Sequence, residues 1–202
     1  MDACVMKAVM GADMPEWIRS FDDAVYSSVS GFITDDMTRV MKFFTFLGSE
    51  LTIALLAVLL PLLVLVLKKR KYYGMALAPM INIAMGALFS QILKYLFQRP
   101  RPDILRLIEI SGYSFPSGHS MNSLIFYGFI AYLLMKNGRH WSRCVFAGAV
   151  GLMVLLIGIS RIYLGVHYAS DVLGGFMIGL GWLILAAKIT KNILFDADRR
   201  SA

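Results

Sequence analysis

Long apolar runs separated by short polar segments dominate the chain from residue 51 onward. The first two runs cover residues 51–67 and 72–97. Three further runs follow, at residues 116–135, 144–159 and 168–187. A helix needs about 20 mainly apolar residues to cross the hydrocarbon core of a bilayer. The pattern therefore predicts an all-α, polytopic transmembrane helix bundle with five spans.

Residues 1–50 contain no run of that length and carry eight acidic residues against four basic ones. Asp22 with Asp23, and Asp35 with Asp36, each precede apolar residues at the spacing of one helix face. Acidic residues in a first turn are favoured by the helix dipole. We predict two short amphipathic helices, broken near Gly31, that lie in the membrane interface. The alternative is that this segment holds a sixth, first membrane-spanning helix.

Composition agrees with a membrane protein. Of the 202 residues, 58% are hydrophobic and the mean hydropathy is +0.66, which excludes an ordinary soluble domain. No internal repeat, low-complexity tract or linker divides the chain, so we expect one domain over 1–202, with an interfacial segment at 1–50 and the bundle at 51–188. The two cysteines, Cys4 and Cys144, form no disulfide framework.

A net charge of +7 could indicate nucleic-acid binding, but the distribution of the charges along the chain argues against it. If the spans alternate, one side of the membrane collects residues 68–71, 136–143 and the C-terminal tail, with charges of +4, +3 and +2. The opposite side holds the N-terminal segment at −4. Basic loops stay in the cytoplasm, so the first side is cytoplasmic and no surplus charge argues for nucleic acid. We expect an integral plasma membrane protein, of bacterial type given its short chain.

Three stretches meet on the outer side under this topology, and together they have the composition of a phosphate site. They contribute the cations Lys94, Arg101 and Arg161, and exposed amides of Ser117 and Gly118 at a helix start. Arginine binds phosphate oxygens through its planar fork, and lysine acts as a point charge. The amides at a helix N-terminus also bind anions.

Two histidines supply the chemistry. His167 and Asp171 stand four residues apart, on one face of an expected helix, so the carboxylate can orient one imidazole nitrogen and leave the other free. His167 is therefore the predicted nucleophile, and His119 the acid that protonates the leaving oxygen. The other carboxylates between the outer ends of the spans, Asp103 and Glu109, are too few for a two-metal phosphatase. We expect catalysis without a metal or cofactor.

Two sets of residues have simpler interpretations. Arg99 and Arg106 are expected to reach lipid headgroups, outside the catalytic set. Glycines recur along the last span, at positions 174, 175, 179 and 181. They predict close helix packing first and a homodimer face second.

The motifs, taken in order, resemble the three-part signature of the type 2 phosphatidate phosphatase superfamily. Lys94 is followed after six residues by Arg101-Pro102, then come Pro116-Ser117-Gly118-His119 and Ser160-Arg161, with His167 and Asp171 at the family's spacing. The resemblance implies phosphate binding by Lys94, Arg101, Ser117, Gly118 and Arg161. It also implies His119 as acid, His167 as nucleophile and Asp171 as its partner. Members of the membrane branch usually have six spans with an outward-facing site.

The expected activity is metal-independent dephosphorylation of a membrane lipid phosphate or pyrophosphate through a phosphohistidine at the extracytoplasmic face. Undecaprenyl pyrophosphate and phosphatidylglycerophosphate or phosphatidate lipids are the substrates that the resemblance implies. The partner is then a lipid in the bilayer, with no nucleic acid and no protein partner. Two alternatives stay open: transfer of the phosphoryl group to another lipid, and a non-hydrolytic transporter that keeps the anion pocket.

Overall fold

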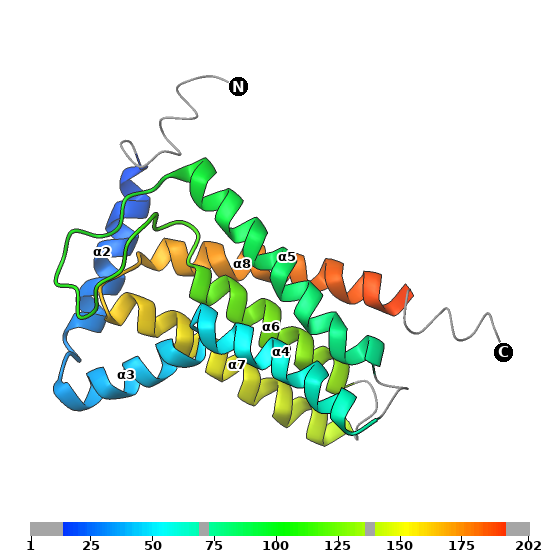
Figure 1. The fold of residues 1–202 in the computed structure, drawn as a ribbon. Helices are drawn as coiled ribbons and strands as arrows, with labels where there is room; N and C mark the ends of the chain where they lie inside the picture. The colour runs from blue at the N-terminus through cyan, green and yellow to red at the C-terminus, as the bar shows by residue number, and fades with distance from the viewer. Residues whose placement is uncertain (1–13, 69–72, 136–139, 193–202) are drawn as a thin grey trace.

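The computed structural model describes residues 14–68, 73–135 and 140–192 of the chain. Every regular element in these ranges is helical (Figure 1). The helices are α2 (Glu16–Ser30), α3 (Asp35–Leu47), α4 (Glu50–Val66), α5 (Tyr73–Phe97), α6 (Gly118–Met135), α7 (His140–Tyr163) and α8 (Ala169–Thr190). The all-α class predicted from the apolar runs is confirmed.

The two helices before residue 50 are confirmed, and Asp35 and Asp36 lie in the first turn of α3 as predicted. The first-turn position predicted for Asp22 and Asp23 is wrong, because α2 begins at Glu16 and both acids lie in its middle. Gly31 ends α2, and Thr34 begins α3 because its side chain accepts a hydrogen bond from the Met37 amide. Both helices lie against the bundle, α2 on α7 and α8, and α3 on α7. Their position in the membrane interface stays a prediction.

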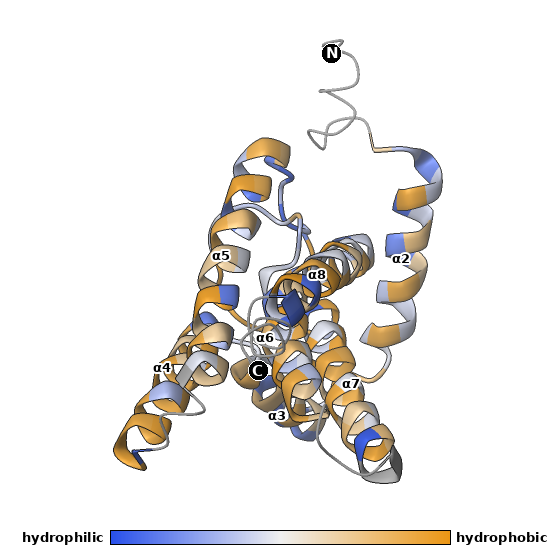
Figure 2. Ribbon diagram, turned by 90° about the vertical axis from the view of Figure 1, so that its right-hand side faces the viewer, coloured by the Kyte–Doolittle hydropathy of each residue, from blue (hydrophilic) through white to orange (hydrophobic). Residues whose placement is uncertain are grey.

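Helix α6 is the centre of the bundle. It packs against α4, α5, α7 and α8, and ten of its residues are buried. Its Met121, Ile125 and Phe126 form the main core cluster with residues of α4 and α5. Figure 2 shows apolar residues along the outward faces of the surrounding helices. The bundle is therefore apolar both inside and outside, as a membrane environment requires.

The structure supports the five predicted spans only in part. Three helical segments are long and apolar enough to cross a bilayer: Gly74–Phe97, Arg143–Tyr163 and Ala169–Thr190. A fourth span arises if α3 and α4, which meet at a bend of 46°, are counted as one broken span. Helix α4 alone has only 17 residues. Helix α6 begins with a polar turn that contains His119 and Asn122, which lowers its hydropathy, and protein surrounds it instead of lipid.

Glycines bring the start of α8 against the start of α6. A side-chain carbon at Gly175 would lie 2.9 Å from the Ser117 carbonyl oxygen, and one at Gly179 would lie 3.1 Å from the Met121 carbonyl oxygen. A side chain would force the neighbouring backbone to shift at Gly175 and would be tight at Gly179, so the predicted close helix packing is confirmed at both positions. A side-chain carbon at Gly181 would meet no atom of another element within 4 Å among the described residues. The contact sets the first turn of α8, with Asp171, beside the first turn of α6, with His119.

Candidate active site

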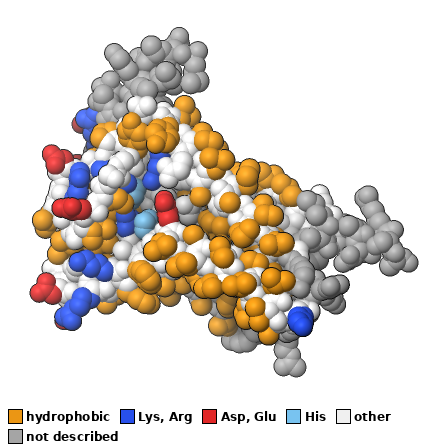
Figure 3. Space-filling model, viewed as in Figure 1, with side chains coloured by type: hydrophobic (Ala, Val, Ile, Leu, Met, Phe, Trp, Pro, Cys, Tyr) orange, Lys and Arg blue, Asp and Glu red, His pale blue; other side chains and the backbone are white. Residues whose placement is uncertain are grey.

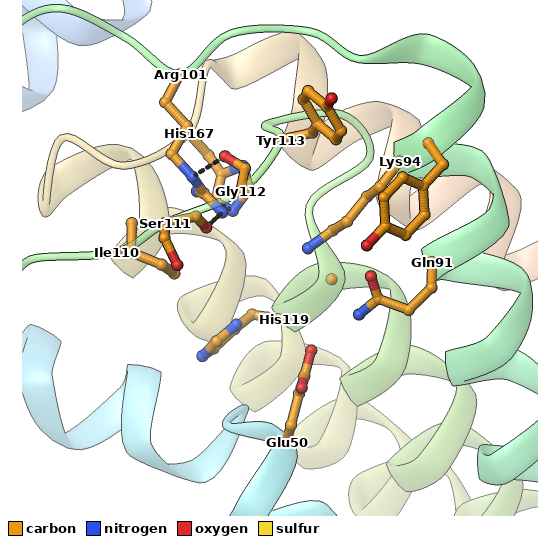
Figure 4. A pocket seen from close by; sticks show the side chains of 12 residues that line it. Glu50, Gln91, Lys94, Arg101, Ile110, Ser111, Gly112, Tyr113, His119 and His167 are labelled. Atoms are coloured by element: carbon orange, nitrogen blue, oxygen red, sulfur yellow. Dashed lines mark hydrogen bonds between the residues drawn. The ribbon is translucent and has the colours of Figure 1, made fainter.

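The three stretches singled out in the sequence converge at one end of the bundle. The end of α5, the start of α6 and the α7–α8 connection surround a cavity of about 430 Å³, which is lined by Lys94, Arg101, Gly118, His119 and His167 among others. Figure 4 shows both histidines and Lys94 pointing into this space from different elements. Figure 3 shows the hollow from outside, with cationic, histidine and acidic side chains in it and hydrophobic surface beside it.

His167 lies before α8 and not on it, which corrects the prediction that it shares a helix face with Asp171. Helix α8 begins at Ala169, and the side chain of Asp171 turns back to accept a hydrogen bond from the Tyr168 amide at 2.9 Å. The same oxygen, Oδ2, lies 3.5 Å from Nδ1 of His167. The capping carboxylate thus still reaches the imidazole, because a first-turn acid folds back over the preceding residues.

Both ring nitrogens of His167 have defined neighbours. On the Nδ1 side, Ser114 Oγ lies 3.4 Å away and itself donates to Asp171 Oδ2. On the other side, Nη1 of Arg101 lies 3.2 Å from Nε2. A guanidinium can only donate, so Nε2 must accept and the ring proton must sit on Nδ1, facing Asp171. In this tautomer the lone pair of Nε2 accepts from Arg101, so this hydrogen bond has to be released before Nε2 can attack phosphorus.

His167 is 2% exposed. The pKa of its imidazole is lowered from 6.5 to about 4, mainly by burial and to a smaller extent by the Arg161 and Arg101 cations, against the opposing effect of Asp171. The neutral imidazole is therefore the stable form at neutral pH, as a nucleophile requires.

Arg101 connects the loop after α5 to the connection before α8. Its guanidinium donates to the carbonyl oxygens of Gly112 at 2.9 Å, Ser111 at 3.1 Å and Val166 at 2.8 Å. Most of its donors are therefore engaged by the protein itself. A phosphate in the cavity must replace one of these carbonyls or use the remaining Nη2 hydrogen.

The other two predicted cations occupy different positions. Lys94 lines the cavity, and its Nζ lies 3.5 Å from the place that a side-chain carbon at Gly118 would take. The ammonium group of Lys94 therefore lies close to the start of α6. Arg161 is 1% exposed and does not line the cavity. Its Nη1 donates to Thr45, while Nε and Nη2 have no partner among the described residues. Buried donors without partners are costly, and an anion would satisfy them.

Ser117 departs from its predicted exposure. It is completely buried, and its amide donates to the Asp171 carbonyl oxygen at 3.1 Å. The close approach of α8 at Gly175 is what covers it. The predicted exposed amide at Ser117 is thus wrong, whereas Gly118 does line the cavity.

The sequence and the fold of the chain are similar to those of known proteins. A family model described as PAP2 superfamily matches residues 75–194. The chain is 36% identical over 183 residues to phosphatidylglycerophosphatase B of Bacillus subtilis, covering 87% of this chain and 86% of that protein. The chain belongs to the PAP2 superfamily. It is a membrane protein and a lipid phosphate phosphatase.

Two more comparisons bear on this PAP2 phosphatase. The crystal structure of the first transmembrane PAP2 type phosphatidylglycerolphosphate phosphatase from Bacillus subtilis aligns with a TM-score of 0.81 and 31% identity, covering 94% of both chains. The undecaprenyl-diphosphatase of Sulfolobus acidocaldarius is 27% identical over 136 residues, which cover 64% of this chain and 61% of that protein.

Sequence reasoning misjudged Arg99 of the PAP2 phosphatase. Arg99 is 5% exposed and donates to Asp171 Oδ1 at 2.6 Å, so it does not reach lipid headgroups. It lies on the far side of Asp171 from His167, outside the cavity. Arg106 is exposed and donates to the Pro102 carbonyl oxygen. Nothing in the local sequence separated these two arginines, because Arg99 is buried only through α8 and α2.

Three residues that line the cavity of the PAP2 phosphatase were also not predicted from the sequence. Glu50 comes from the start of α4, Gln91 from α5 and Tyr113 from the long loop (Figure 4). Glu50 and Gln91 lie in or beside apolar runs where a lone polar residue carries no signal of its own. Within the described ranges, no group of three or more histidine, cysteine or acidic side chains has a metal-binding arrangement.

Proposed function

We propose that the protein removes a terminal phosphate from a phosphatidylglycerophosphate-type membrane lipid, through a phosphohistidine on His167. The observation that carries this proposal is the junction of the histidine cavity with an apolar groove. A lipid phosphate would need the cavity for its phosphate and the adjoining groove for its tail. The groove distinguishes a lipid substrate from a water-soluble phosphate ester.

The apolar groove runs between α4 and α5. It encloses about 380 Å³ and is lined by small and aliphatic residues that include Ile53, Ala57, Ile83 and Leu88. Glu50 and Gln91 line both this groove and the histidine cavity, so the two spaces share a border. An amphiphile with its headgroup among the cations would extend its tail along the groove. Because the tail comes from bilayer hydrocarbon and not from water, the groove would favour it through packing contacts and shape.

In the first step, Nε2 of His167 attacks phosphorus and the bond to the lipid oxygen breaks. His119 donates a proton to that oxygen, so the product leaves as an alcohol or a lower phosphate. Asp171 stabilises the positive charge on the histidine through Nδ1, as the oriented pair supports. Lys94, Arg101 and Arg161 carry the predicted role of neutralising charge on the three equatorial oxygens.

In the second step, His119 accepts a proton from water, and the water oxygen attacks phosphorus. The bond between phosphorus and Nε2 breaks, its electron pair returns to His167, and inorganic phosphate is released. Both histidines regain their starting protonation, so the cycle balances. Gly118, which lines the cavity, keeps its predicted place in the phosphate cradle through its amide, whereas the Ser117 hydroxyl is buried and accepts from the Ser120 hydroxyl.

The substrate proposal rests on relatives whose names differ. The Bacillus subtilis protein that matches most of the chain is named a phosphatidylglycerophosphatase, which favours a glycerophosphate headgroup. The Sulfolobus relative is named an undecaprenyl-diphosphatase, which keeps a prenyl pyrophosphate as the second candidate. The carboxylate of Glu50 at the border of the two spaces favours the first, because it can accept a hydrogen bond from the glycerol hydroxyl, a group that a prenyl pyrophosphate lacks.

A substrate panel tests the proposal. Purified protein in detergent micelles is given phosphatidylglycerophosphate, undecaprenyl pyrophosphate, phosphatidate and diacylglycerol pyrophosphate, with and without EDTA. We expect release of inorganic phosphate, fastest from phosphatidylglycerophosphate, at an unchanged rate with EDTA. A tenfold preference for undecaprenyl pyrophosphate would favour the second candidate. Complete loss of activity in EDTA, restored by a divalent metal, would contradict the mechanism.

The same assay separates hydrolysis from phosphoryl transfer. Hydrolysis releases one inorganic phosphate for each lipid consumed. A transferase would consume the donor lipid and form a new phospholipid without free phosphate. Short-chain water-soluble phosphate esters serve as the matched control, because they occupy the histidine cavity without the groove. We expect them to show a KM at least about tenfold higher, since the tail contribution to binding is absent.

We propose further that the site faces the extracytoplasmic side, as the basic loops suggest. The test uses a Cys4→Ser background and the exposed Cys144, which lies in the first turns of α7, at its other end from the site. A second variant adds Glu109→Cys in the exposed loop on the site side. An impermeant thiol reagent on intact cells should modify the cysteine at position 109 and reach Cys144 only after permeabilisation. The reverse pattern would overturn the orientation.

A further inference from the structure

We propose that Asp22 is a positioning residue for catalysis, which acts on Asp171 through Arg99 and so orients His167. The inference rests on the proposed function of His167 as nucleophile. It assigns a role in the reaction to α2, the amphipathic helix that precedes the bundle and lies outside the residues matched by the family model.

Arg99 is held between two carboxylates. Its Nη1 donates to Asp171 Oδ1 at 2.6 Å, and its Nη2 donates to Asp22 Oδ2 at 2.9 Å. The plane of the guanidinium also lies over the Tyr168 ring, with its carbon 4.1 Å from the ring centroid. All three charged side chains are at most 6% exposed. The geometry of this ion-pair chain is therefore protected from solvent.

Asp22 is anchored at more than one point. Besides Arg99, its carboxylate accepts hydrogen bonds from the Ser170 amide and the Ser170 hydroxyl, both at 2.7 Å. Ser170 Oγ in turn lies 2.8 Å from Arg99 Nη1. Ser170 directly precedes Asp171, so Asp22 fixes the backbone of the first turn of α8 as well as the guanidinium. A surface acid on an amphipathic helix would not need three such contacts.

The chain of contacts decides which oxygen of Asp171 faces the histidine. Arg99 occupies Oδ1, so Oδ2 is left for Ser114, the Tyr168 amide and Nδ1 of His167. Without Asp22, Arg99 would keep Asp171 as its only carboxylate partner among these three residues. The formal charge of the cluster would also change from −1 to zero. Asp171 would then stabilise a positive His167 less well.

The first test compares Asp22→Asn with Asp23→Asn. Both variants remove one acid from the same turn of α2. Of these two acids, Asp22 is the one that accepts a hydrogen bond from Arg99. We expect kcat of Asp22→Asn to fall about 10- to 100-fold with KM within about twofold of wild type, because partners that orient a reactive group typically have effects of that size. Asp23→Asn should keep wild-type kcat and KM.

A double-mutant cycle with Arg99→Lys tests whether Asp22 acts through Arg99. We expect the double variant to be no slower than the slower of the two single variants. Multiplication of the two losses would contradict the relay. If Asp22→Asn does not accumulate in the membrane, Ser170→Ala gives the same test with every charge retained. It should lower kcat by a few-fold without a change in KM.

A second readout does not depend on turnover. Hydrogen exchange at the imidazole C2 carbon, followed by mass spectrometry, reports the titration midpoint of each histidine. We expect the midpoint of His167 to move below its wild-type value in Asp22→Asn, since the cluster loses a negative charge while Asp171, Arg101 and Arg161 stay in place. Local unfolding would instead move it up, toward the ordinary pKa of about 6.5. Such an upward shift would show that Asp22 is only a structural anchor.

The outcomes also separate the relay from the proposed function. Turnover by the wild-type protein decides the function. The ratio of the variant kcat to the wild-type kcat, and the shift of the His167 titration midpoint, test whether Asp22 acts on Asp171 through Arg99. A protein with no activity toward any lipid phosphate, but with the expected shift, would contradict the function and leave the relay supported.

Discussion

Replacing His167 with glutamine should lower kcat at least about 10⁴-fold, because removal of the nucleophile of a covalent mechanism leaves only the effects of binding and electrostatics. Glutamine keeps a polar side chain in the cavity and cannot form the phosphoenzyme. Inorganic phosphate release measures the loss. Brief reaction with ³²P-labelled substrate and alkaline quenching, which preserves phosphohistidine, should label the wild-type protein and not the variant.

His140→Gln is the matched control. His140 is the remaining histidine of the three in the chain, and it begins α7, whose other end carries Arg161. The control should keep wild-type turnover. Labelling of the His167→Gln protein, together with its loss in His119→Gln, would reverse the two histidine roles.

Asp171→Asn has the second-largest expected effect, with kcat lowered about 10³- to 10⁴-fold because the amide no longer selects the required tautomer of its histidine. The substitution also removes one carboxylate from a buried ion-pair chain. Breaking a buried pair typically costs about 3–5 kcal/mol in the free energy of unfolding, and Arg99 keeps Asp22, so the lower end of that range is expected. Activity and thermal unfolding in detergent measure the two effects separately.

Ser114→Ala provides the comparison for Asp171→Asn. It removes one hydrogen bond to Oδ2 of Asp171 and leaves the carboxylate and Arg99 in place. We expect a loss of kcat below about tenfold. Equal losses in the two variants would mean that the hydroxyl, and not the charge, orients His167.

Some of the residues that line the cavity could be predicted from the sequence because they share one physical property. Ionisable groups at the ends of apolar runs are rare, and an alternating topology brings such ends together. Lys94, His119 and His167 can therefore be recognised from the sequence as one group. The close packing of α8 on α6 was predictable for a similar reason, since Gly175 and Gly179 recur at helical spacing.

The contacts that support the cavity could not be predicted from local pattern. Asp22 has the sequence context of a first-turn acid on an amphipathic helix, and Arg99 that of an arginine at a membrane boundary. Only the packing of α2 on α8 makes them partners of Asp171. Likewise, the burial of the Ser117 amide depends on the approach of α8, and the turn between His167 and Ala169 depends on the cap that Asp171 forms.

The shared border of the histidine cavity and the apolar groove has a consequence for the end of the reaction. On the proposed function, cleavage yields a dephosphorylated lipid and an inorganic anion whose preferred solvents are opposite. The lipid is already in contact with the hydrocarbon side at α4 and α5, whereas the anion faces the polar loop that carries Arg101. Each product can depart into its own phase, and neither has to pass through the other.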